Sequence, residues 1–360
     1  MKKKSIQDAV IAAWENEKMN IHPFKLLLRG MSLFYRLAIL VRNILFDTGL
    51  LRQKKVPCRV VGVGNITVGG TGKTPMVIYL ANLLNSKGFR PVVLSRGYRG
   101  KTKAPINIVS DGRRILMKPE DCGDEPALIA KRLPGIPVLT GPRRALTAGV
   151  AIEQFGADVL VLDDAFQYRQ LARDVDVVLL DADRPLGNGW VLPAGPLREP
   201  GSSLKRADLI IRTGLGDRVT AISTTTPQYR ARHQAVALID GASGRELPLQ
   251  SLLGRRVCAF AGIAKPGAFK QILAGLGART VAFLPFPDHH DYSREDIREI
   301  QNRARQEQAD TIVTTEKDGV KLNRFHMFLE EVDFLQVEMV FQGGEDEFIA
   351  SLMDKLGQAQ

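Results

Sequence analysis

From Arg59 onward, short runs of apolar and β-branched residues alternate with longer segments in which apolar positions recur at helical spacing. This alternation is typical of α/β proteins, in which helices flank a mostly parallel sheet. Several runs are apolar throughout, as expected for strands buried on both faces. The pattern predicts strands at 59–63, 91–95, 159–162, 175–180, 209–212, 236–239, 257–261, 281–286 and 311–314, and helices at 74–86, 126–133, 145–154, 266–276, 294–306 and 346–356.

The first 55 residues follow a different pattern, in which basic side chains interrupt an apolar stripe. Between residues 33 and 51, Arg36, Arg42, Asn43 and Asp47 leave no uncharged stretch near the roughly 20 residues that span a bilayer. A late apolar region without a small-residue cleavage site also argues against a signal peptide. We expect amphipathic helices that lie on a membrane surface, and packing on the chain's own domain is the alternative.

Composition narrows the class of partner. The chain has 360 residues and a formal net charge of +11, which favours an anionic partner such as a nucleotide, a nucleic acid or an acidic membrane surface. Its three cysteines are far apart, which argues against a disulfide framework and a zinc site and predicts a cytosol-facing location. No zinc finger or aromatic RNA-binding motif is present, so we expect no nucleic-acid partner.

A glycine-rich loop follows the predicted strand at 59–63 and leads directly into a helix. Strand, loop and helix occur in the order of a P-loop, so we expect bound nucleoside triphosphate and magnesium. In such a loop, Lys73 supplies positive charge to the β and γ phosphates, and the hydroxyl of Thr74 can ligate magnesium. Thr67 stands where a first glycine is usual. The predicted phosphate-binding residues are Gly69, Gly70, Thr71, Gly72, Lys73 and Thr74.

Carboxylates follow the apolar strand at 159–162. Asp163 and Asp164 would lie at the carboxyl edge of the sheet, where a P-loop protein needs an acidic group for magnesium. Thr74, Asp163 and Asp164 are therefore the predicted metal residues. Asp181 and Asp183, after the next strand, are weaker candidates, since solvated strand ends explain them better than a metal role does.

Triphosphate binding alone does not distinguish a kinase from a GTPase switch or a motor. The guanine-reading Asn-Lys-x-Asp tetrad is missing, and residues 315–318 read Thr-Glu-Lys-Asp. That segment predicts either a base-contacting loop or a solvated helix N-terminus.

A kinase also needs a group that accepts a proton from the acceptor hydroxyl, commonly a carboxylate, alone or with histidine. Asp124 precedes a predicted helix, where a plain N-cap is the alternative. His289 and His290 form the densest histidine cluster.

Several blocks, in order along nearly the whole chain, together resemble the tetraacyldisaccharide 4'-kinase family of lipid A synthesis. Such an ordered set is much more specific than the P-loop alone. The blocks are residues 64–75 (Gly-Asn-Ile-Thr-Val-Gly-Gly-Thr-Gly-Lys-Thr-Pro), 95–98 (Ser-Arg-Gly-Tyr), 123–126 (Gly-Asp-Glu-Pro), 163–167 (Asp-Asp-Ala-Phe-Gln), 192–200 (Leu-Pro-Ala-Gly-Pro-Leu-Arg-Glu-Pro), 288–289 (Asp-His) and 315–318.

The resemblance implies that ATP, with Mg2+, phosphorylates the 4'-hydroxyl of a tetraacyl glucosamine disaccharide 1-phosphate, giving a lipid A precursor, lipid IVA. It places the enzyme on the cytosolic face of the inner membrane of a Gram-negative bacterium, with no obligate protein partner inferred. It assigns catalysis to Asp124, assisted by His289, and to Lys73, and it makes Arg96, Tyr98 and Arg143 plausible substrate contacts.

The chain departs from the family pattern at two positions. Ala165 and Tyr168 stand where the family commonly has glycine and histidine, so any role of that histidine is lost or taken by the phenol. The choice of Asp124 over Asp164 as the base rests on the resemblance. The choice of His289 over His290 is not decided by the sequence.

These observations predict three parts: membrane-associated amphipathic helices at 1–55, a P-loop kinase core at 56–225, and a smaller C-terminal α/β lobe at 226–360 that completes the cleft. A polar, threonine-rich stretch at 224–228 suggests the second boundary. Two rivals remain: a P-loop switch that recruits a partner through the N-terminal stripe, and a kinase of a soluble acceptor.

Overall fold

The computed structural model describes Val10, Trp14 and residues 23–214 and 220–357. It divides into two compact units, each assembled from distant segments. Unit 1 comprises Met1–Lys73, Val159–Ala231 and Phe341–Gln360, and unit 2 comprises Thr74–Asp158 and Arg232–Val340. Most of the first 22 residues of the predicted membrane-associated segment, including the basic side chains Lys2, Lys3, Lys4 and Lys18, lie outside the described residues. The boundaries proposed from the sequence, 1–55, 56–225 and 226–360, stay a prediction.

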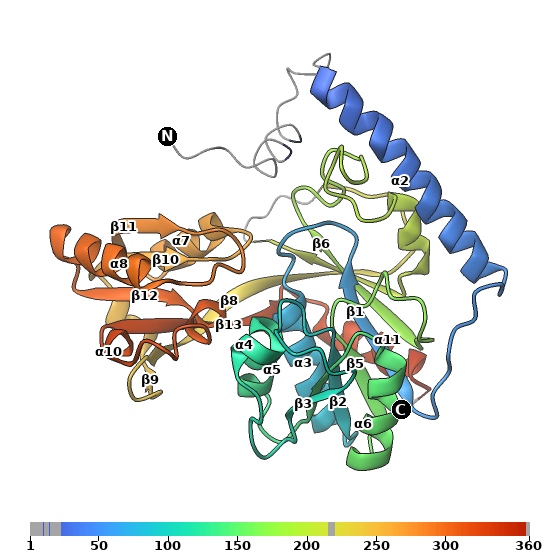
Figure 1. Cartoon of the computed structure of the whole chain (residues 1–360), viewed down its shortest axis with the longest axis horizontal. Helices are drawn as coiled ribbons and strands as arrows, with labels where there is room; N and C mark the ends of the chain where they lie inside the picture. Colours follow the sequence, from blue (N-terminus) through green and yellow to red (C-terminus); the bar gives the residue numbers. More distant parts are fainter. Residues whose placement is uncertain (1–9, 11–13, 15–22, 215–219, 358–360) are drawn as a thin grey trace. The chain divides into compact units, whose positions relative to one another are not determined.

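Unit 1 is built on parallel strands in the order β7, β6, β1 and β5, and the first residues of β8 join β7. Apolar side chains on these strands are almost fully buried, as expected for parallel strands covered on both faces. The carboxyl ends of β1 and β5 lie side by side, so the segments that follow them meet at one edge (Figure 1). The elements are α2 (Pro23–Asp47), β1 (Arg59–Asn65), β5 (Val159–Leu162), β6 (Val175–Asp181), the 3-10 helix Gly201–Arg206, β7 (Leu209–Thr213), the start of β8 (Gln228–Asp240) and α11 (Glu345–Lys355).

Helix α2, the long blue helix in Figure 1, packs against the rest of unit 1 through a narrow stripe of its own surface. Ser32 donates to the Val191 carbonyl at 2.8 Å, and the Tyr35 hydroxyl donates to the Arg198 carbonyl at 3.0 Å. Much of the remaining surface of the helix is apolar and exposed, the reverse of an ordinary surface helix. The exposed side chains are Leu26, Leu27, Met31, Leu33, Phe34, Leu37, Leu40, Val41 and Ile44.

A buried carboxylate anchors this helix. Glu199 is fully buried and accepts from Arg42 at 2.8 Å, from Asn43 at 3.1 Å and from Arg206 at 2.8 Å. Burial opposes the ionised form of Glu199, but the charges of Arg206 and Arg42 and the hydrogen bonds of Ser203 and Asn43 outweigh it and lower its pKa below 4.5. The ion cluster therefore joins α2 to the segment that carries Arg198.

Replacing Glu199 by glutamine should lower the free energy of unfolding by about 3 kcal/mol, because two partly buried guanidinium groups lose their counter-charge. The lowered pKa sets the sign of the pH effect. The Glu199 contribution is fully present above its ordinary value of 4.5 and is lost as pH falls through the lower folded value. Denaturant unfolding of wild type and variant at pH 7 and pH 4 measures both the loss of stability and its dependence on pH. Asp47→Asn, which removes an exposed partner of Arg169, is the matched control, and an equal effect of both variants would refute the prediction.

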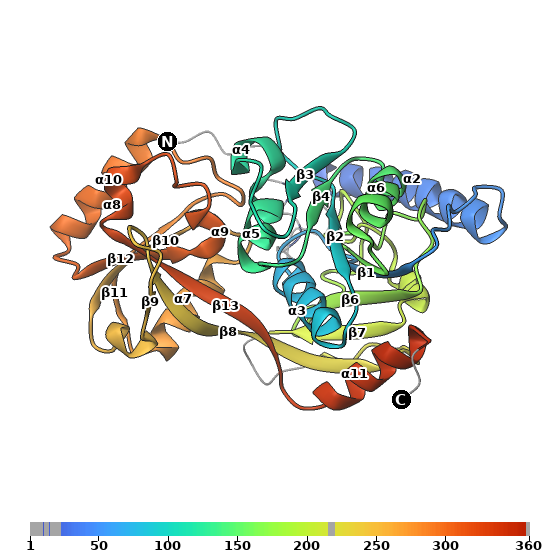
Figure 2. The ribbon, with the colours of Figure 1, turned by 90° about the horizontal axis from the view of Figure 1, so that it is seen from below.

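Unit 2 contains two sets of strands. In the first set β2 and β4 are parallel and β3 is antiparallel to β4. In the second set the order is β11, β10, β12 and β13, all parallel, and α8 and α10 cover one face while α7 covers the other (Figure 2). The elements are α3 (Lys73–Ser86), β2 (Pro91–Ser95), β3 (Asn107–Ser110), α4 (Pro119–Cys122), α5 (Asp124–Arg132), β4 (Val138–Thr140), α6 (Arg144–Phe155), β9 (Glu246–Leu247), the 3-10 helix Leu249–Leu252, β10 (Arg256–Ala261), α7 (Pro266–Gly275), β11 (Arg279–Pro285), α8 (Arg294–Gln306), β12 (Thr311–Thr315), α9 (Glu316–Gly319), α10 (His326–Leu329) and β13 (Val332–Phe341).

Each strand and helix predicted from the sequence is present, with ends shifted by a few residues at most, except that β8 begins at Gln228, eight residues before the predicted strand. The sequence pattern did not predict β3, β4, β9, β13 or the short helices α4 and α10. The short helix α9, which begins after Thr315, is the helix start that was one of the two alternatives for residues 315–318. The α/β class with a mostly parallel, helix-flanked sheet is confirmed.

Candidate functional site

The predicted P-loop lies between the end of β1 and the start of α3. Gly69 and Gly72 have φ angles of 109° and 87°, which side chains with a Cβ rarely adopt, so the loop requires glycine at both positions. Lys73 is the first residue of α3 and Thr74 the second. The amide groups of this helix start are therefore available to an anion, as in other phosphate-binding loops.

Polar side chains from neighbouring strands hold the loop in unit 1. The Asn65 amide, at the end of β1, donates to the Thr71 hydroxyl at 3.0 Å, and the Thr213 hydroxyl, at the end of β7, donates to the Thr71 carbonyl at 2.9 Å. Gln167 donates to the Asn65 carbonyl at 2.8 Å. The loop is thereby fixed from several sides, which limits the reorganisation that phosphate binding requires.

Asp163 and Asp164 follow β5 as predicted and have different surroundings. Asp163 is only 2% exposed, whereas Asp164 has a φ of 48° and a half-exposed carboxylate. Arg198 donates to both oxygens of Asp164 at 2.9 Å, and Lys73 Nζ lies 3.5 Å from one of them. The structure thus places a second cation, Arg198, beside the P-loop lysine.

The oxygen donors near the P-loop fit magnesium. Thr74 and Asp163 offer a hydroxyl and a carboxylate, which are the hard ligands that Mg2+ prefers. In the described part of the chain, no three or more His, Cys, Asp or Glu side chains gather into a metal cluster.

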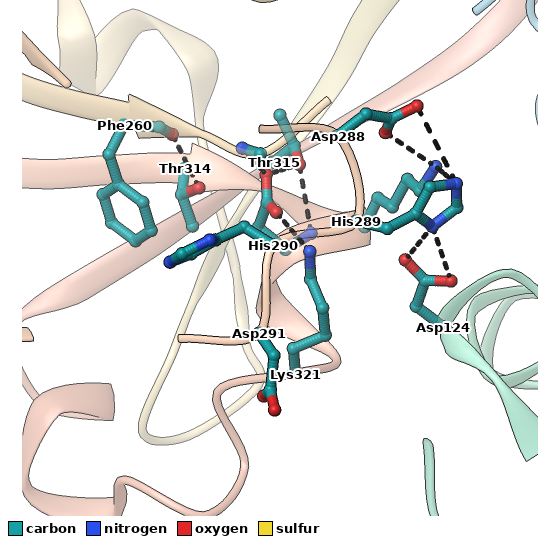
Figure 3. A network of polar contacts seen from close by, with 12 residues as sticks. Asp124, Phe260, Asp288, His289, His290, Asp291, Thr314, Thr315 and Lys321 are labelled. Carbon is teal, nitrogen blue, oxygen red and sulfur yellow. Dashed lines mark hydrogen bonds and ion pairs between the residues drawn. The ribbon is translucent and has the colours of Figure 1, made fainter. Parts of the chain in front are cut away.

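Within unit 2, Asp124 and His289 form a pair although 165 residues separate them. The Nδ1 atom of His289 lies 2.8 Å from Asp124 Oδ2 and 3.0 Å from Oδ1 (Figure 3). Asp124 is the first residue of α5, and its carboxylate also accepts from the Glu125 amide at 3.0 Å. The helix start favours negative charge at this position.

The backbone around His289 is firmly held. Its φ of 58° is unusual for a residue with a side chain, and its amide donates to the Gly262 carbonyl at 3.1 Å. Arg99 donates to the His289 carbonyl at 2.8 Å, and the ring of Tyr98 meets the imidazole edge-on with centroids 5.9 Å apart. The imidazole is therefore oriented by its neighbours as well as by Asp124.

Electrostatics keep Asp124 ionised. Burial opposes the charged form, but the hydrogen bond from His289 and the charge of Lys317 outweigh it and lower the pKa of Asp124 to about 2. The carboxylate is therefore negative throughout the neutral range and is suited to accept a hydrogen bond from a hydroxyl group.

The other predicted residues are placed as follows. His290 bonds Asp296 at 3.0 Å and stacks on Phe286, so it supports the start of α8 and does not contact Asp124. Tyr98 lies beside the Asp124–His289 pair, with 57% of its surface exposed. Arg96 and Arg143 are exposed, Arg96 directly after β2 and Arg143 directly before α6.

Sequence reasoning assigned no role to Arg198 or Lys317. Arg198 lies within the block at 192–200 and Lys317 within the block at 315–318, so both segments were noticed. The spacing of neither block indicates which carboxylates these cations face.

Comparison with known proteins shows which family the chain resembles. The family model described as tetraacyldisaccharide-1-P 4'-kinase, LpxK, matches residues 24–357. The chain is 51% identical over 345 residues to a tetraacyldisaccharide 4'-kinase of Syntrophus aciditrophicus, covering 91% of this chain and 92% of that one. It is 43% identical to one of Anaeromyxobacter sp. strain Fw109-5, covering 88% of each.

The chain is also similar to a solved structure, LpxK from Aquifex aeolicus in complex with ATP. The two share 33% sequence identity, with a TM-score of 0.77 over 92% of this chain and 99% of the other. These matches confirm the family resemblance, the P-loop α/β fold and the assignment as a kinase. The chain belongs to the tetraacyldisaccharide-1-phosphate 4'-kinase family.

Proposed function

We propose that this kinase transfers the γ-phosphate of ATP to the 4'-hydroxyl of a tetraacyl glucosamine disaccharide 1-phosphate. We further propose that Asp124 accepts a hydrogen bond from this 4'-hydroxyl. The observation that carries the assignment of the base is the 2.8 Å contact between Asp124 and His289. This contact pairs an ionised carboxylate with an oriented imidazole, an arrangement suited to bind an acceptor hydroxyl. The chain belongs to a phosphotransferase family, which needs such a group.

The nucleotide is bound by Gly69, Gly70, Thr71, Gly72, Lys73 and Thr74. Lys73 and Arg198 bring positive charge to the phosphates, where charge is redistributed during transfer. Bound Mg2+, held by Thr74, Asp163 and Asp164, would neutralise phosphate charge and orient the γ-phosphate.

The acceptor side depends on Asp124 and His289. Asp124 accepts a hydrogen bond from the sugar hydroxyl and orients its oxygen for in-line attack on the γ-phosphorus. The transition state of phosphoryl transfer is loose, so a weakly basic carboxylate suffices for this role. Tyr98, next to the pair, and the exposed cations Arg96 and Arg143 are proposed to contact the sugar and its phosphate.

Helix α2 is proposed to contact the cytosolic face of the inner membrane. Its exposed apolar side chains would enter the interface between headgroups and acyl chains, which suits an acylated substrate. Among the described residues, none of the helices combines the length and apolarity needed to traverse a bilayer. The membrane-contacting part of the chain is proposed to be residues 1–55, which include α2.

Replacing Phe34 by glutamate should weaken binding to lipid vesicles at least about tenfold, because burial of a phenyl group contributes about 2 kcal/mol. Phe34 is 78% exposed, so the change should leave the unfolding temperature unaltered. Co-sedimentation with vesicles containing anionic lipid measures the effect. Leu253→Glu, at a side chain 71% exposed in unit 2, is the matched control. Equal binding of both variants would contradict membrane contact by α2.

The proposed function is tested with ATP labelled at the γ-phosphate and a detergent-dispersed disaccharide 1-phosphate lipid. Phosphorylated lipid should form, and its formation should require magnesium. Hydrolysis of ATP without any lipid product would instead favour a nucleotide-dependent switch. Transfer to a deacylated disaccharide as efficient as transfer to the lipid would favour a soluble acceptor.

A further inference from the structure

Three carboxylates and one lysine surround the imidazole of His289 in unit 2. Besides Asp124, Glu125 Oε1 and Asp288 Oδ2 lie 3.9 Å and 3.8 Å from His289 Nε2. Lys317 Nζ lies 3.0 Å from Glu125 Oε1, 3.5 Å from Asp288 Oδ1 and 3.4 Å from His289 Nε2. Figure 3 shows His289 between Asp124 on one side and Asp288 on the other.

The chemistry of lysine determines which ring nitrogen carries the proton. An ammonium group can only donate hydrogen bonds, so the nitrogen that faces it must offer a lone pair. Nε2 faces Lys317, which leaves the proton on Nδ1, and Nδ1 faces the carboxylate of Asp124, which can only accept. Both neighbours of the ring therefore require the same tautomer.

We propose that Lys317 is a positioning residue of the phosphotransfer reaction: it holds His289 as the neutral Nδ1–H tautomer that donates to Asp124. The proposal rests on the proposed function and adds to it a role for the segment at 315–318. Lys317 acts through His289 and Asp124, and it orients the pair without reacting itself.

The charges explain why a cation is required at this position. Without Lys317, the carboxylates of Glu125 and Asp288 would be the groups nearest Nε2 and would favour a proton on that nitrogen. A neutral ring with its proton on Nε2 would turn a lone pair toward Asp124 and could not donate a hydrogen bond to its carboxylate. Burial disfavours the charged form of Lys317, but Glu125, Asp124 and Asp288 outweigh it and raise the pKa of Lys317 above its ordinary value.

Local structure fixes the lysine in place. It lies in the short helix α9, where the Thr315 hydroxyl accepts from the Asp318 amide at 3.1 Å. The neighbouring Glu316 accepts from Arg132 of α5 at 2.7 Å, so α9 is bound to the helix that begins with Asp124. The other charged groups facing the pair are Lys321, which lowers the pKa of Asp124 more weakly, and Arg99.

The tautomer is read directly by 15N NMR of the full chain labelled at histidine, with the His289 signals assigned by their loss in His289→Gln. At pH 7 wild type should show a protonated Nδ1 and an unprotonated Nε2. In Lys317→Met the proton should no longer be confined to Nδ1, and Nε2 should become partly protonated. Lys317→Arg should retain the neutral ring, because guanidinium also only donates. Lys131→Met, at an exposed lysine of α5, should match wild type.

Activity provides the second readout. In Lys317→Met, kcat/KM for lipid phosphorylation should fall about 10- to 100-fold, as for other supporting contacts of a reactive group. The acidic limb of the pH profile of kcat/KM should lie at higher pH in Lys317→Met than in wild type. Lys317→Arg should restore much of the lost activity. A purely structural lysine would lower activity without moving the pH profile.

A wild-type ring with its proton on Nε2, or doubly protonated at pH 7, would overturn the proposal even if Lys317→Met does not fold. An unchanged ring and pH profile in folded Lys317→Met would overturn it as well. Absence of lipid phosphorylation by wild type refutes the proposed function instead, and the NMR measurement still reports on the tautomer.

Discussion

Replacing Lys73 by alanine should lower kcat for lipid phosphorylation by about 10³-fold, the scale measured when a fixed group that stabilises transition-state charge is removed. Lys73 is the first residue of α3 and its ammonium lies 3.5 Å from Asp164. The alanine variant removes one of the two cations beside the phosphates and leaves Arg198 paired with Asp164. Single-turnover transfer of labelled γ-phosphate measures the effect.

Lys87→Ala is the matched control, because this exposed lysine lies just after the same helix. It should match wild type in rate and in thermal unfolding. Binding of a fluorescent ATP analogue separates weaker binding from slower transfer. A Lys73→Ala variant that transfers phosphate within about tenfold of the wild-type rate would place the principal phosphate charge on another residue, Arg198 first.

The sequence predicts those strands and helices whose apolar pattern is enough to identify them. The strand at 159–162 is an uninterrupted apolar run, the strand at 175–180 is apolar except for Asp176, and both lie in the buried parallel part of unit 1. β13 was missed because Asp333, Gln336 and Glu338 interrupt its apolar residues, giving a pattern that fits neither a fully buried strand nor an amphipathic helix. β4 has only three residues, which is too few for any periodicity.

The candidate site could be predicted only in part, for a physical reason. The P-loop is one contiguous segment, so sequence order specifies its local structure. The pairing of Asp124 with His289 depends on tertiary folding across 165 residues, and only the family resemblance indicated it. Arg198 and Lys317 were not assigned because each is next to a glutamate in the sequence, and such a cation looks like any solvated charge until its carboxylate partners in space are known.

The pKa of Asp124 constrains the pH dependence of the reaction. Since His289 and Lys317 lower this pKa to about 2, the carboxylate keeps its charge as pH falls from 8 to 4. Any acidic limb of the wild-type profile in that range therefore reports another group, such as the imidazole or the phosphate of the substrate. The low pKa of Asp124 therefore favours an electrostatic and orienting role over strong general-base catalysis, which needs a pKa nearer the working pH.

Replacing Asp124 by asparagine should lower kcat by about 10²- to 10³-fold, the scale for loss of one fixed electrostatic contact to the reacting groups. Asparagine has nearly the same shape, but its amide oxygen is a poorer hydrogen-bond acceptor than the carboxylate and carries no negative charge. Binding of ATP should be unchanged, because no nucleotide-binding residue contacts Asp124 in the proposed scheme.

Lipid phosphorylation at saturating ATP measures this prediction, with Asp121→Asn in the neighbouring helix α4 as the matched control. His289→Asn should show a smaller loss, because the carboxylate remains, and the double variant should lose little more than Asp124→Asn alone. That non-additivity is expected of residues that act as one unit. Full additivity would mean that His289 acts independently of Asp124, and an Asp124→Asn variant with wild-type kcat would move the base assignment to Asp164.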